Sequence, residues 1–106
     1  MSGYVVSDLA YEEIRGEVDR LDHETGGPDA GDRLAEGFRK AFERIAAHPR
    51  QGKDRSRIDP GLRSIPWGRY TIFYYAHPSL VEIARVLHQK QSVALAFGLE
   101  EDAEGV

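Results

Sequence analysis

Residues 61–88 read GLRSIPWGRYTIFYYAHPSLVEIARVLH, and no other part of the sequence says more about the fold. Two turn signals, Trp67-Gly68 and His77-Pro78-Ser79, divide it into three runs rich in β-branched and aromatic residues. The runs predict strands over residues 62–66, 69–76 and 80–88, which follow one another as an antiparallel meander.

Side chains alternate along the middle strand of this meander, so both of its faces carry large groups. One face holds Tyr70, Ile72 and Tyr74, and the other holds Thr71, Phe73 and Tyr75. One of these faces can pack under helices. The other needs a cover, which is either the apolar segment 93–97 of this chain or a segment of a partner.

The residues before the meander predict one strand and two helices. Tyr4-Val5-Val6 is long enough for a short strand. Apolar residues then recur at steps of three and four in two runs, and Gly26-Gly27-Pro28 separates them. The polar segment 50–60 is expected to be a loop. The predicted fold class is therefore α+β: an N-terminal strand, an antiparallel helical hairpin and a three-stranded antiparallel meander.

The chain has 106 residues, enough for one domain. We expect this domain to span residues 1–91, followed by a tail over residues 92–106 that is first apolar and then acidic and exposed to solvent. The sequence has no cysteine, no apolar run near the roughly 20 residues that cross a bilayer, and no visible secretory signal. A cytoplasmic protein that does not contact membranes is the expectation.

The net charge of −4 is unevenly distributed along the chain. Residues 1–49 carry 11 acids and 6 bases, whereas residues 50–90 carry 3 acids and 8 bases. The overall charge argues against sequence-specific DNA binding by this chain alone, while its basic middle could meet an acidic partner or a phosphate backbone. The four histidines show no metal-ligand spacing, and we expect neither a metal nor a cofactor.

Several motifs occur in a characteristic order. They are Ser7-x-x-Ala10-x-x-Glu13-Ile14, His48-Pro49-x-x-Gly52, Gly61-Leu62-Arg63, Gly68-Arg69-Tyr70-Thr71-Ile72-Phe73-Tyr74 and Val81-Glu82-Ile83-x-x-Val86-Leu87-His88. This succession, over roughly residues 4–91, resembles the RelE/ParE toxin superfamily, and in particular the ParE-like toxins of type II toxin–antitoxin systems.

The resemblance implies one of two activities. ParE-like toxins inhibit DNA gyrase through protein contact and are not hydrolases, whereas RelE-like toxins are ribosome-dependent endoribonucleases that cut mRNA. For a nuclease, the candidate catalytic residues are Arg63, Arg85 and His88. Gln89 follows His88 where some nuclease members place a tyrosine, so the ParE-like activity is favoured. A non-toxic interaction module of the same fold is a further alternative.

The resemblance also implies a ParD-like antitoxin, in a complex of 2:2 or higher stoichiometry. Candidate contacts with the target or the antitoxin are Arg63, Trp67, Arg69, Tyr74, Arg85 and His88. Candidate residues of an antitoxin groove are Ile14, Val18, Phe38 and Phe42. Structural ion pairs with Glu82 or Asp59 could instead explain one or two of the strand arginines. We predict that Arg63→Glu or Arg85→Glu weakens toxicity or antitoxin binding without unfolding the domain.

Overall fold

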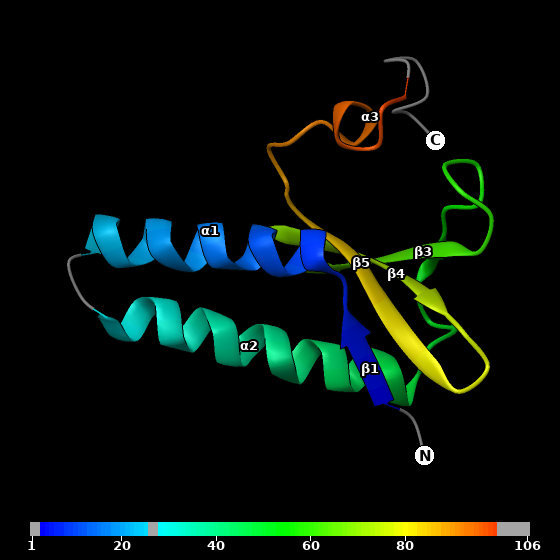
Figure 1. The fold of residues 1–106 in the computed structure, drawn as a ribbon, viewed down its shortest axis with the longest axis horizontal. Coiled ribbons are helices and arrows are strands. Elements are labelled where there is room, and N and C mark those ends of the chain that lie inside the picture. Colours follow the sequence, from blue (N-terminus) through cyan, green and yellow to red (C-terminus); the bar gives the residue numbers. More distant parts are fainter. Residues whose placement is uncertain (1–2, 26–27, 100–106) are drawn as a thin grey trace.

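A computed structural model describes residues 3–25 and 28–99 (Figure 1). The elements in chain order are β1 (Gly3–Val6), α1 (Asp8–Thr25), α2 (Pro28–Ala47), β2 (Lys53–Asp54), β3 (Leu62–Trp67), β4 (Tyr70–Ala76), β5 (Leu80–His88) and α3 (Val93–Ala96). The predicted α+β order of strand, helical hairpin and meander is confirmed, and β2 and α3 are added to it. Within the described ranges, no helix has the length and apolar character needed to cross a membrane.

The strands form one five-stranded mixed sheet in the order β1-β5-β4-β3-β2. The meander β3-β4-β5 is antiparallel, and β1 runs parallel to β5 from the Gly3–Leu80 pair to the Val6–Ile83 pair. The prediction that residues 50–60 form a loop is wrong at β2, where Lys53 and Asp54 pair with β3. Since β2 is a polar edge strand with exposed side chains, no apolar alternation marks it in the sequence.

The inner face of the sheet carries the larger core, because both helices pack against it (Figure 1). Phe38, Phe42 and Ile45 of α2 are buried with Tyr70, Ile72 and Tyr74 of β4, so of the two faces of β4 this one packs under the helices. Gly37 permits the close contact between α2 and the sheet. A Cβ atom at this position would lie 2.7 Å from the Trp67 ring.

The outer face carries a smaller core, which the C-terminal segment covers. Leu62, Phe73 and Leu87 are buried there, and Val93, Ala96 and Phe97 pack against them from α3 and its end. The rings of Phe73 and Phe97 lie 5.0 Å apart in an edge-to-face contact. Of the two covers that the sequence left open, this chain's own apolar segment therefore occupies the outer face. The helix break at Gly26-Gly27 and the acidic residues 100–104 lie outside the described residues.

Candidate functional site

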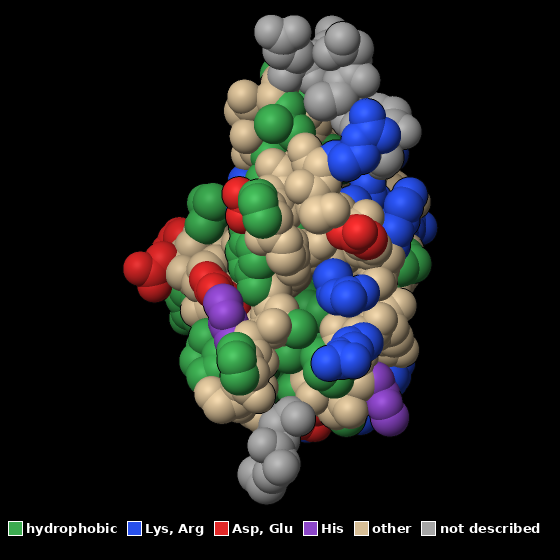
Figure 2. All heavy atoms as spheres, turned by 90° about the vertical axis from the view of Figure 1, so that its right-hand side faces the viewer, with side chains coloured by type: hydrophobic (Ala, Val, Ile, Leu, Met, Phe, Trp, Pro, Cys, Tyr) green, Lys and Arg blue, Asp and Glu red, His purple; other side chains and the backbone are tan. Residues whose placement is uncertain are grey.

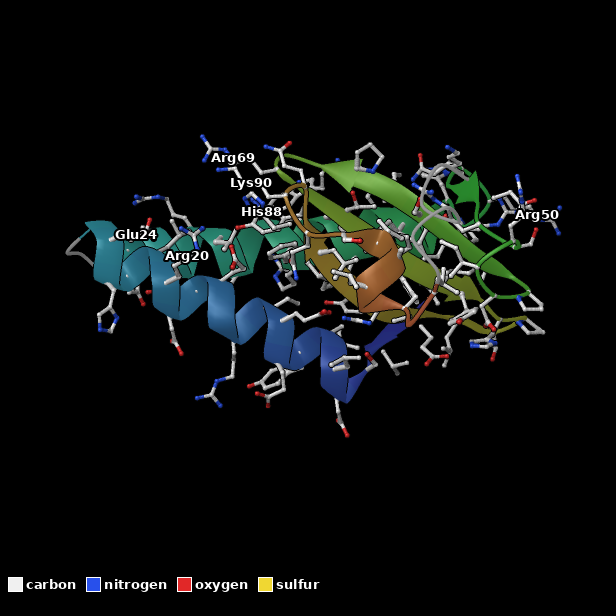
Figure 3. The ribbon with its side chains drawn as sticks, turned by 90° about the horizontal axis from the view of Figure 1, so that it is seen from above. Arg20, Glu24, Arg50, Arg69, His88 and Lys90 are labelled. Carbon is white, nitrogen blue, oxygen red and sulfur yellow. The ribbon has the colours of Figure 1, made fainter. Side chains whose placement is uncertain are left out.

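Five side chains gather where β5 ends beside α1, and we call them the sheet-end cluster: Glu17, Arg20, Tyr70, His88 and Lys90. Tyr70 and His88 are cross-strand neighbours, with ring centroids 5.5 Å apart. The Lys90 amide donates to Nδ1 of His88 at 3.1 Å. Figure 3 shows Arg20 on α1 and His88 and Lys90 at the end of the sheet, with Arg69 nearby. An open depression in this region is lined by Glu17, Arg20, His88, Lys90 and Gln91.

Hydrogen bonds fix the charge states within this cluster. The Tyr70 hydroxyl donates to Oε1 of Glu17 at 2.9 Å, and Arg20 donates to the same oxygen at 3.0 Å. Burial opposes ionisation of Glu17, but the hydrogen bonds from Arg20 and Tyr70 outweigh it and hold the carboxyl pKa below its usual value. Burial and the bond to Glu17 raise the pKa of Tyr70. Glu17 is therefore an anion and Tyr70 a neutral donor at pH 7.

The three predicted nuclease residues do not form one site. Arg63 lies opposite Tyr74, and His88 lies opposite Tyr70. Those two tyrosines are four positions apart on β4, which corresponds to roughly 13 Å at about 3.3 Å per residue. Arg85 lies opposite Phe73 and therefore projects from the outer face of the sheet. The resemblance had suggested these residues as one catalytic set, but the alternation of strand side chains turns Arg85 to the outer face, and the length of β4 separates Arg63 from His88 on the inner face.

Arg85 is held inside the fold by α1 and α3. Its Nε and Nη2 donate to one oxygen of Glu13 at 3.0 and 2.7 Å, and its Nη1 donates to the Ala96 carbonyl at 2.6 Å. The guanidinium also lies over the Phe97 ring, 5.3 Å from its centroid. The sequence had suggested Glu82 or Asp59 as an ion-pair partner for the strand arginines. This is wrong for Arg85, and Glu82 instead contacts His77 while Asp59 accepts from Tyr75. No local spacing could have found Glu13, because 72 positions separate it from Arg85.

Tyr74 and Arg63 stabilise the segment before β2. The buried Tyr74 hydroxyl accepts from the Gly52 amide at 3.0 Å and donates to the Pro49 carbonyl at 2.8 Å. Arg63 donates to the carbonyls of Arg50 and Gly52. Tyr74 is 0% exposed, so its predicted contact with a partner is wrong for the folded chain. Arg63 is half-buried and keeps part of its guanidinium at the surface.

The predicted antitoxin groove also falls largely within the core. Phe38 and Phe42 are 1% and 3% exposed, and Ile14 packs against the same core. Val18 is half-buried and lies close to Gly31 of α2. Apolar residues at steps of three and four mark the face of a helix that the domain itself buries, so this periodicity cannot indicate a surface for another protein.

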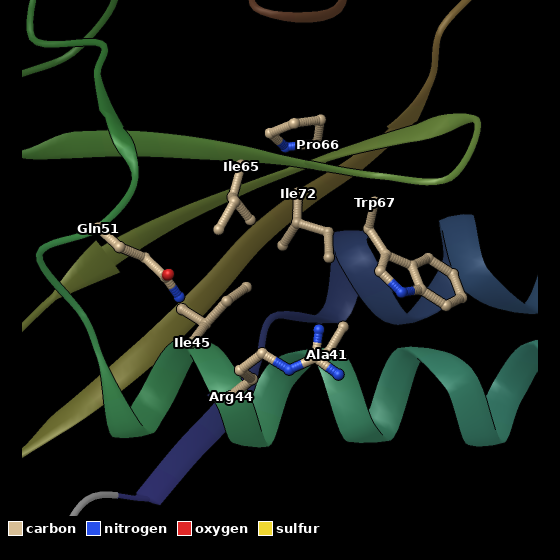
Figure 4. Close-up of a pocket in the computed structure, with 8 residues that line it drawn as sticks. All are labelled: Ala41, Arg44, Ile45, Gln51, Ile65, Pro66, Trp67 and Ile72. Carbon is tan, nitrogen blue, oxygen red and sulfur yellow. The ribbon is translucent and has the colours of Figure 1, made fainter.

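A different apolar pocket lies between α2 and the edge of β3 (Figure 4). Its volume is about 40 Å³, and it is lined by Ala41, Arg44, Ile45, Gln51, Ile65, Pro66, Trp67 and Ile72. Trp67 is the one predicted contact residue among them. The proline on β3 is the sequence signal for this open edge, because proline cannot donate to a neighbouring strand. No group of three or more His, Cys, Asp or Glu side chains suited to a metal occurs in residues 3–25 and 28–99.

Comparison with protein families matches residues 4–93 to the model described as "ParE toxin of type II toxin-antitoxin system, parDE". The chain belongs to the ParE toxin family. A curated relative, Toxin ParE1 of Mycobacterium tuberculosis (strain CDC 1551 / Oshkosh), is 30% identical over 93 residues, which cover 87% of this chain and 94% of the relative. Toxin ParE3 of Caulobacter vibrioides is 28% identical over 88 residues, covering 80% of this chain and 88% of that protein.

A solved structure supports the ParE fold of this chain. The structure titled "Chromosomal ParDE TA system from P. aeruginosa" aligns with a TM-score of 0.68 and 14% identity, covering 83% of this chain and 96% of that one. At this level of identity, the likeness concerns the fold. The ParE-family chain is thus a toxin of a type II toxin–antitoxin system with the RelE/ParE-like architecture.

Proposed function

We propose that this ParE-family toxin inhibits DNA gyrase in the cytoplasm and is neutralised by a ParD-like antitoxin. The match to the ParE model over residues 4–93 is the observation that carries the proposal. The separation of Arg63, Arg85 and His88 removes the nuclease site expected from the sequence, because RNA cleavage needs an acid, a base and cationic groups around one phosphate.

Inhibition by contact needs a complementary surface rather than catalytic groups. Trp67, Arg69 and His88 lie at one end of the sheet, since the Gln89 amide donates to the Arg69 carbonyl and the Trp67 and Tyr70 rings are stacked. Arg69 is exposed, and Trp67 and His88 are half-buried. This end of the sheet is the proposed contact with gyrase. Arg63, at the opposite end of the inner face, is kept as a second contact.

The pocket between α2 and β3 is the proposed site of the antitoxin (Figure 4). At about 40 Å³ it is far smaller than the roughly 300–1,000 Å³ of small-molecule pockets, so it could receive a single apolar side chain of a polypeptide segment. Arg44 at its rim is exposed and could meet an acidic residue of that segment. A dimeric antitoxin would then give a 2:2 or larger complex.

Expression in a bacterium tests the toxin–antitoxin pair. Induction of this chain should arrest growth, and co-expression of the small protein encoded beside it should relieve the arrest. Arg44→Glu should stay toxic but escape neutralisation. The control, Arg33→Glu, lies on the same helix outside the pocket and should be neutralised normally. A folded chain that causes no arrest would contradict toxicity and favour a non-toxic interaction module.

A RelE-like ribonuclease is the second candidate, because the sheet-end cluster brings a carboxylate, a tyrosine and a histidine beside two cations. Cleavage of ribosome-bound mRNA by the purified chain tests it. Loss of cleavage in His88→Gln, but not in the exposed control His48→Gln, would assign the activity to this cluster. Absence of cleavage by the unaltered chain eliminates this candidate.

A further inference from the structure

Cations on the helices and cations near β2 have different electrostatic surroundings. The two helices carry six cations among eleven acids, and Arg20 and Arg39 each pair with two glutamates. Residues 50–63, around β2 and the start of β3, instead carry five cations and two acids. We call these five cations the basic surface: Arg50, Lys53, Arg55, Arg57 and Arg63. Positive charge thus gathers in one segment of a chain whose net charge is −4.

The outer cations of the basic surface are available to a partner. Arg50, Lys53 and Arg57 are exposed, and no carboxylate within the described ranges forms an ion pair with them. Figure 2 shows Lys and Arg side chains gathered along one side of the face at this end of the molecule. Figure 3 shows Arg50 at the end opposite Arg69 and His88. The basic surface is therefore separate from the sheet-end contact proposed for gyrase.

The two acids of this segment are engaged elsewhere. Asp54 accepts from the Ser56 amide at 2.8 Å, and this bond and the Ser56 side chain hold the Asp54 pKa below its usual value. Asp59 accepts from the Tyr75 hydroxyl at 2.6 Å. Neither carboxylate forms an ion pair with Arg50, Lys53 or Arg57, so an anionic ligand would not have to displace it.

Hydrogen bonds hold the backbone under the basic surface in one conformation. Arg63 donates to the carbonyls of Arg50 and Gly52 at 3.2 and 3.0 Å. The Ile58 amide closes the next turn by donating to the Arg55 carbonyl at 2.9 Å, and the Ile58 side chain packs against the outer core. Because the cations project from a fixed backbone, binding a ligand should cost little ordering entropy.

The basic surface lacks the apolar groups that give protein interfaces their affinity. Each exposed large hydrophobic side chain of the described ranges lies outside residues 50–63. Protein interfaces depend on a few buried aromatic and apolar anchors. Phosphate backbones are bound instead by Arg and Lys together with polar side chains such as Gln and Ser, and Gln51 and Ser56 are exposed beside the cations. The chemistry of the surface therefore favours a phosphate backbone over an acidic protein.

The same residues favour a duplex over a single strand. Proteins that bind single strands stack the bases on exposed aromatic rings, and residues 50–63 contain no aromatic residue. No helix lies within these residues to enter a major groove. Contact with the backbone of a duplex, without recognition of its bases, is what such a surface can provide.

We propose that the basic surface binds the phosphate backbone of duplex DNA without reading its sequence. Phosphates repel the acidic helices, so the chain should approach a duplex with β2 foremost. The choice of DNA over RNA rests on the proposed target, since gyrase acts on duplex DNA. Binding to the duplex needs no gyrase, and it would concentrate the toxin on the nucleic acid on which its target works.

Fluorescence anisotropy of a labelled DNA duplex, titrated with the full chain, tests this binding. At about 50 mM salt, Arg50→Ser, Lys53→Ser and Arg57→Ser together should lower the affinity at least about tenfold, and the plot of log affinity against log salt should become less steep by about 3. The matched control, Arg15→Ser, Arg33→Ser and Lys40→Ser, removes the same charge from exposed helical positions and should keep the affinity within about twofold. Arg63 is unaltered in both variants, and equal urea midpoints show that both are folded.

Amide NMR signals locate the contact in the unaltered chain. The duplex should shift the signals of residues 50–57 and leave those around Arg69 and His88 unchanged. Equal losses of affinity in the two triple variants would overturn the proposal, because only net charge would then matter. So would tighter binding of an oligoglutamate peptide of equal charge, which would assign the surface to an acidic protein, or tighter binding of an RNA duplex or a single strand. No gyrase is present, so these results are distinct from a failure of gyrase inhibition.

Discussion

Arg85 shows how a residue that resembles a binding group in the sequence can belong to the interior of the fold. It connects α1, β5 and α3 through Glu13, the Ala96 carbonyl and the Phe97 ring. The second oxygen of Glu13 accepts the Val86 amide at 2.8 Å, so the carboxylate is fully engaged. For this reason Arg85→Glu, which places two carboxylates together, should unfold the domain, contrary to our expectation from the sequence. The prediction that Arg63→Glu weakens partner contact without unfolding is retained.

Arg85→Ala should lower the free energy of unfolding by about 2–4 kcal/mol, because it leaves the carboxylate of Glu13 without its cation. The two side chains are only 15% and 16% exposed, which limits screening by water. Arg20→Ala is the matched control. Its ion pairs are much more exposed, so its effect should stay below about 1 kcal/mol. Urea unfolding of both variants gives the comparison, and equal losses would show that the Arg85 pair is not a structural link.

Tyr75 should contribute to alkaline unfolding. Burial, together with the hydrogen bond to Asp59, raises its pKa to about 12. The folded chain therefore holds this proton more tightly than the unfolded chain, in which the tyrosine pKa is about 10. The stabilisation is complete below pH 10 and is lost as the pH rises from about 10 through 12.

Tyr75→Phe removes this titration. Between pH 9 and 12 its free energy of unfolding should fall less than that of the unaltered chain, by up to about 2 kcal/mol. Urea unfolding at several pH values measures the difference, with the exposed Tyr11→Phe as control. If the free energy of unfolding falls equally steeply with pH in Tyr75→Phe and in the unaltered chain, the titration of Tyr75 does not contribute to alkaline unfolding.

At the scale of elements, the sequence predicted what depends on local periodicity. The alternation in β4 grouped Tyr70, Ile72 and Tyr74 on one face, which the structure shows to be the inner one, and the helical spacing predicted the buried face of α2. The polar edge strand β2 was missed, because only its pairing with Arg63 and Ser64 makes it a strand. The role of Gly52 was also invisible. A Cβ atom there would lie 2.4 Å from the Tyr74 hydroxyl, and this contact joins residues 22 positions apart.

The candidate site was predicted less well than the fold. Phe38, Phe42 and Tyr74 were expected to meet partners and are buried, whereas Trp67, Arg69 and His88 do lie at one end of the sheet. Glu17 and Arg20, which complete the sheet-end cluster, lie on α1, a helix far from β4 and β5 in the sequence. Their positions depend on how α1 packs against β5, and no motif encodes that packing.

Removal of α3 should expose the outer face of the sheet. A chain ending at Gln91, the predicted domain boundary, lacks Val93, Ala96 and Phe97, which cover Leu62, Phe73 and Leu87. We expect it to be less stable, to bind the dye ANS and to self-associate, because a contiguous apolar face is then open. Phe97→Ala alone should give a smaller change of the same sign. A truncated chain that is as stable and monomeric as the full one would place the domain boundary at residue 91.

At the scale of the molecule, charge divides the domain into an acidic hairpin and a basic sheet. Residues 1–49 carry an excess of acids and residues 50–90 an excess of bases. Such an arrangement orients an approaching charged partner, and it makes the association rate dependent on salt. The proposed gyrase contact and the β3 side of the proposed antitoxin pocket both involve the basic half of the chain.

The proposed inhibition of DNA gyrase can be measured as the loss of supercoiling activity in the presence of the purified toxin. Increasing toxin should reduce supercoiling and trap gyrase on cleaved DNA, and the proposed ParD-like antitoxin should restore activity. The reaction should be run at several salt concentrations, since contacts through the basic half should weaken as salt rises. Unchanged supercoiling at toxin concentrations that cleave ribosome-bound mRNA would contradict gyrase inhibition and assign the chain to the ribonuclease branch of its superfamily.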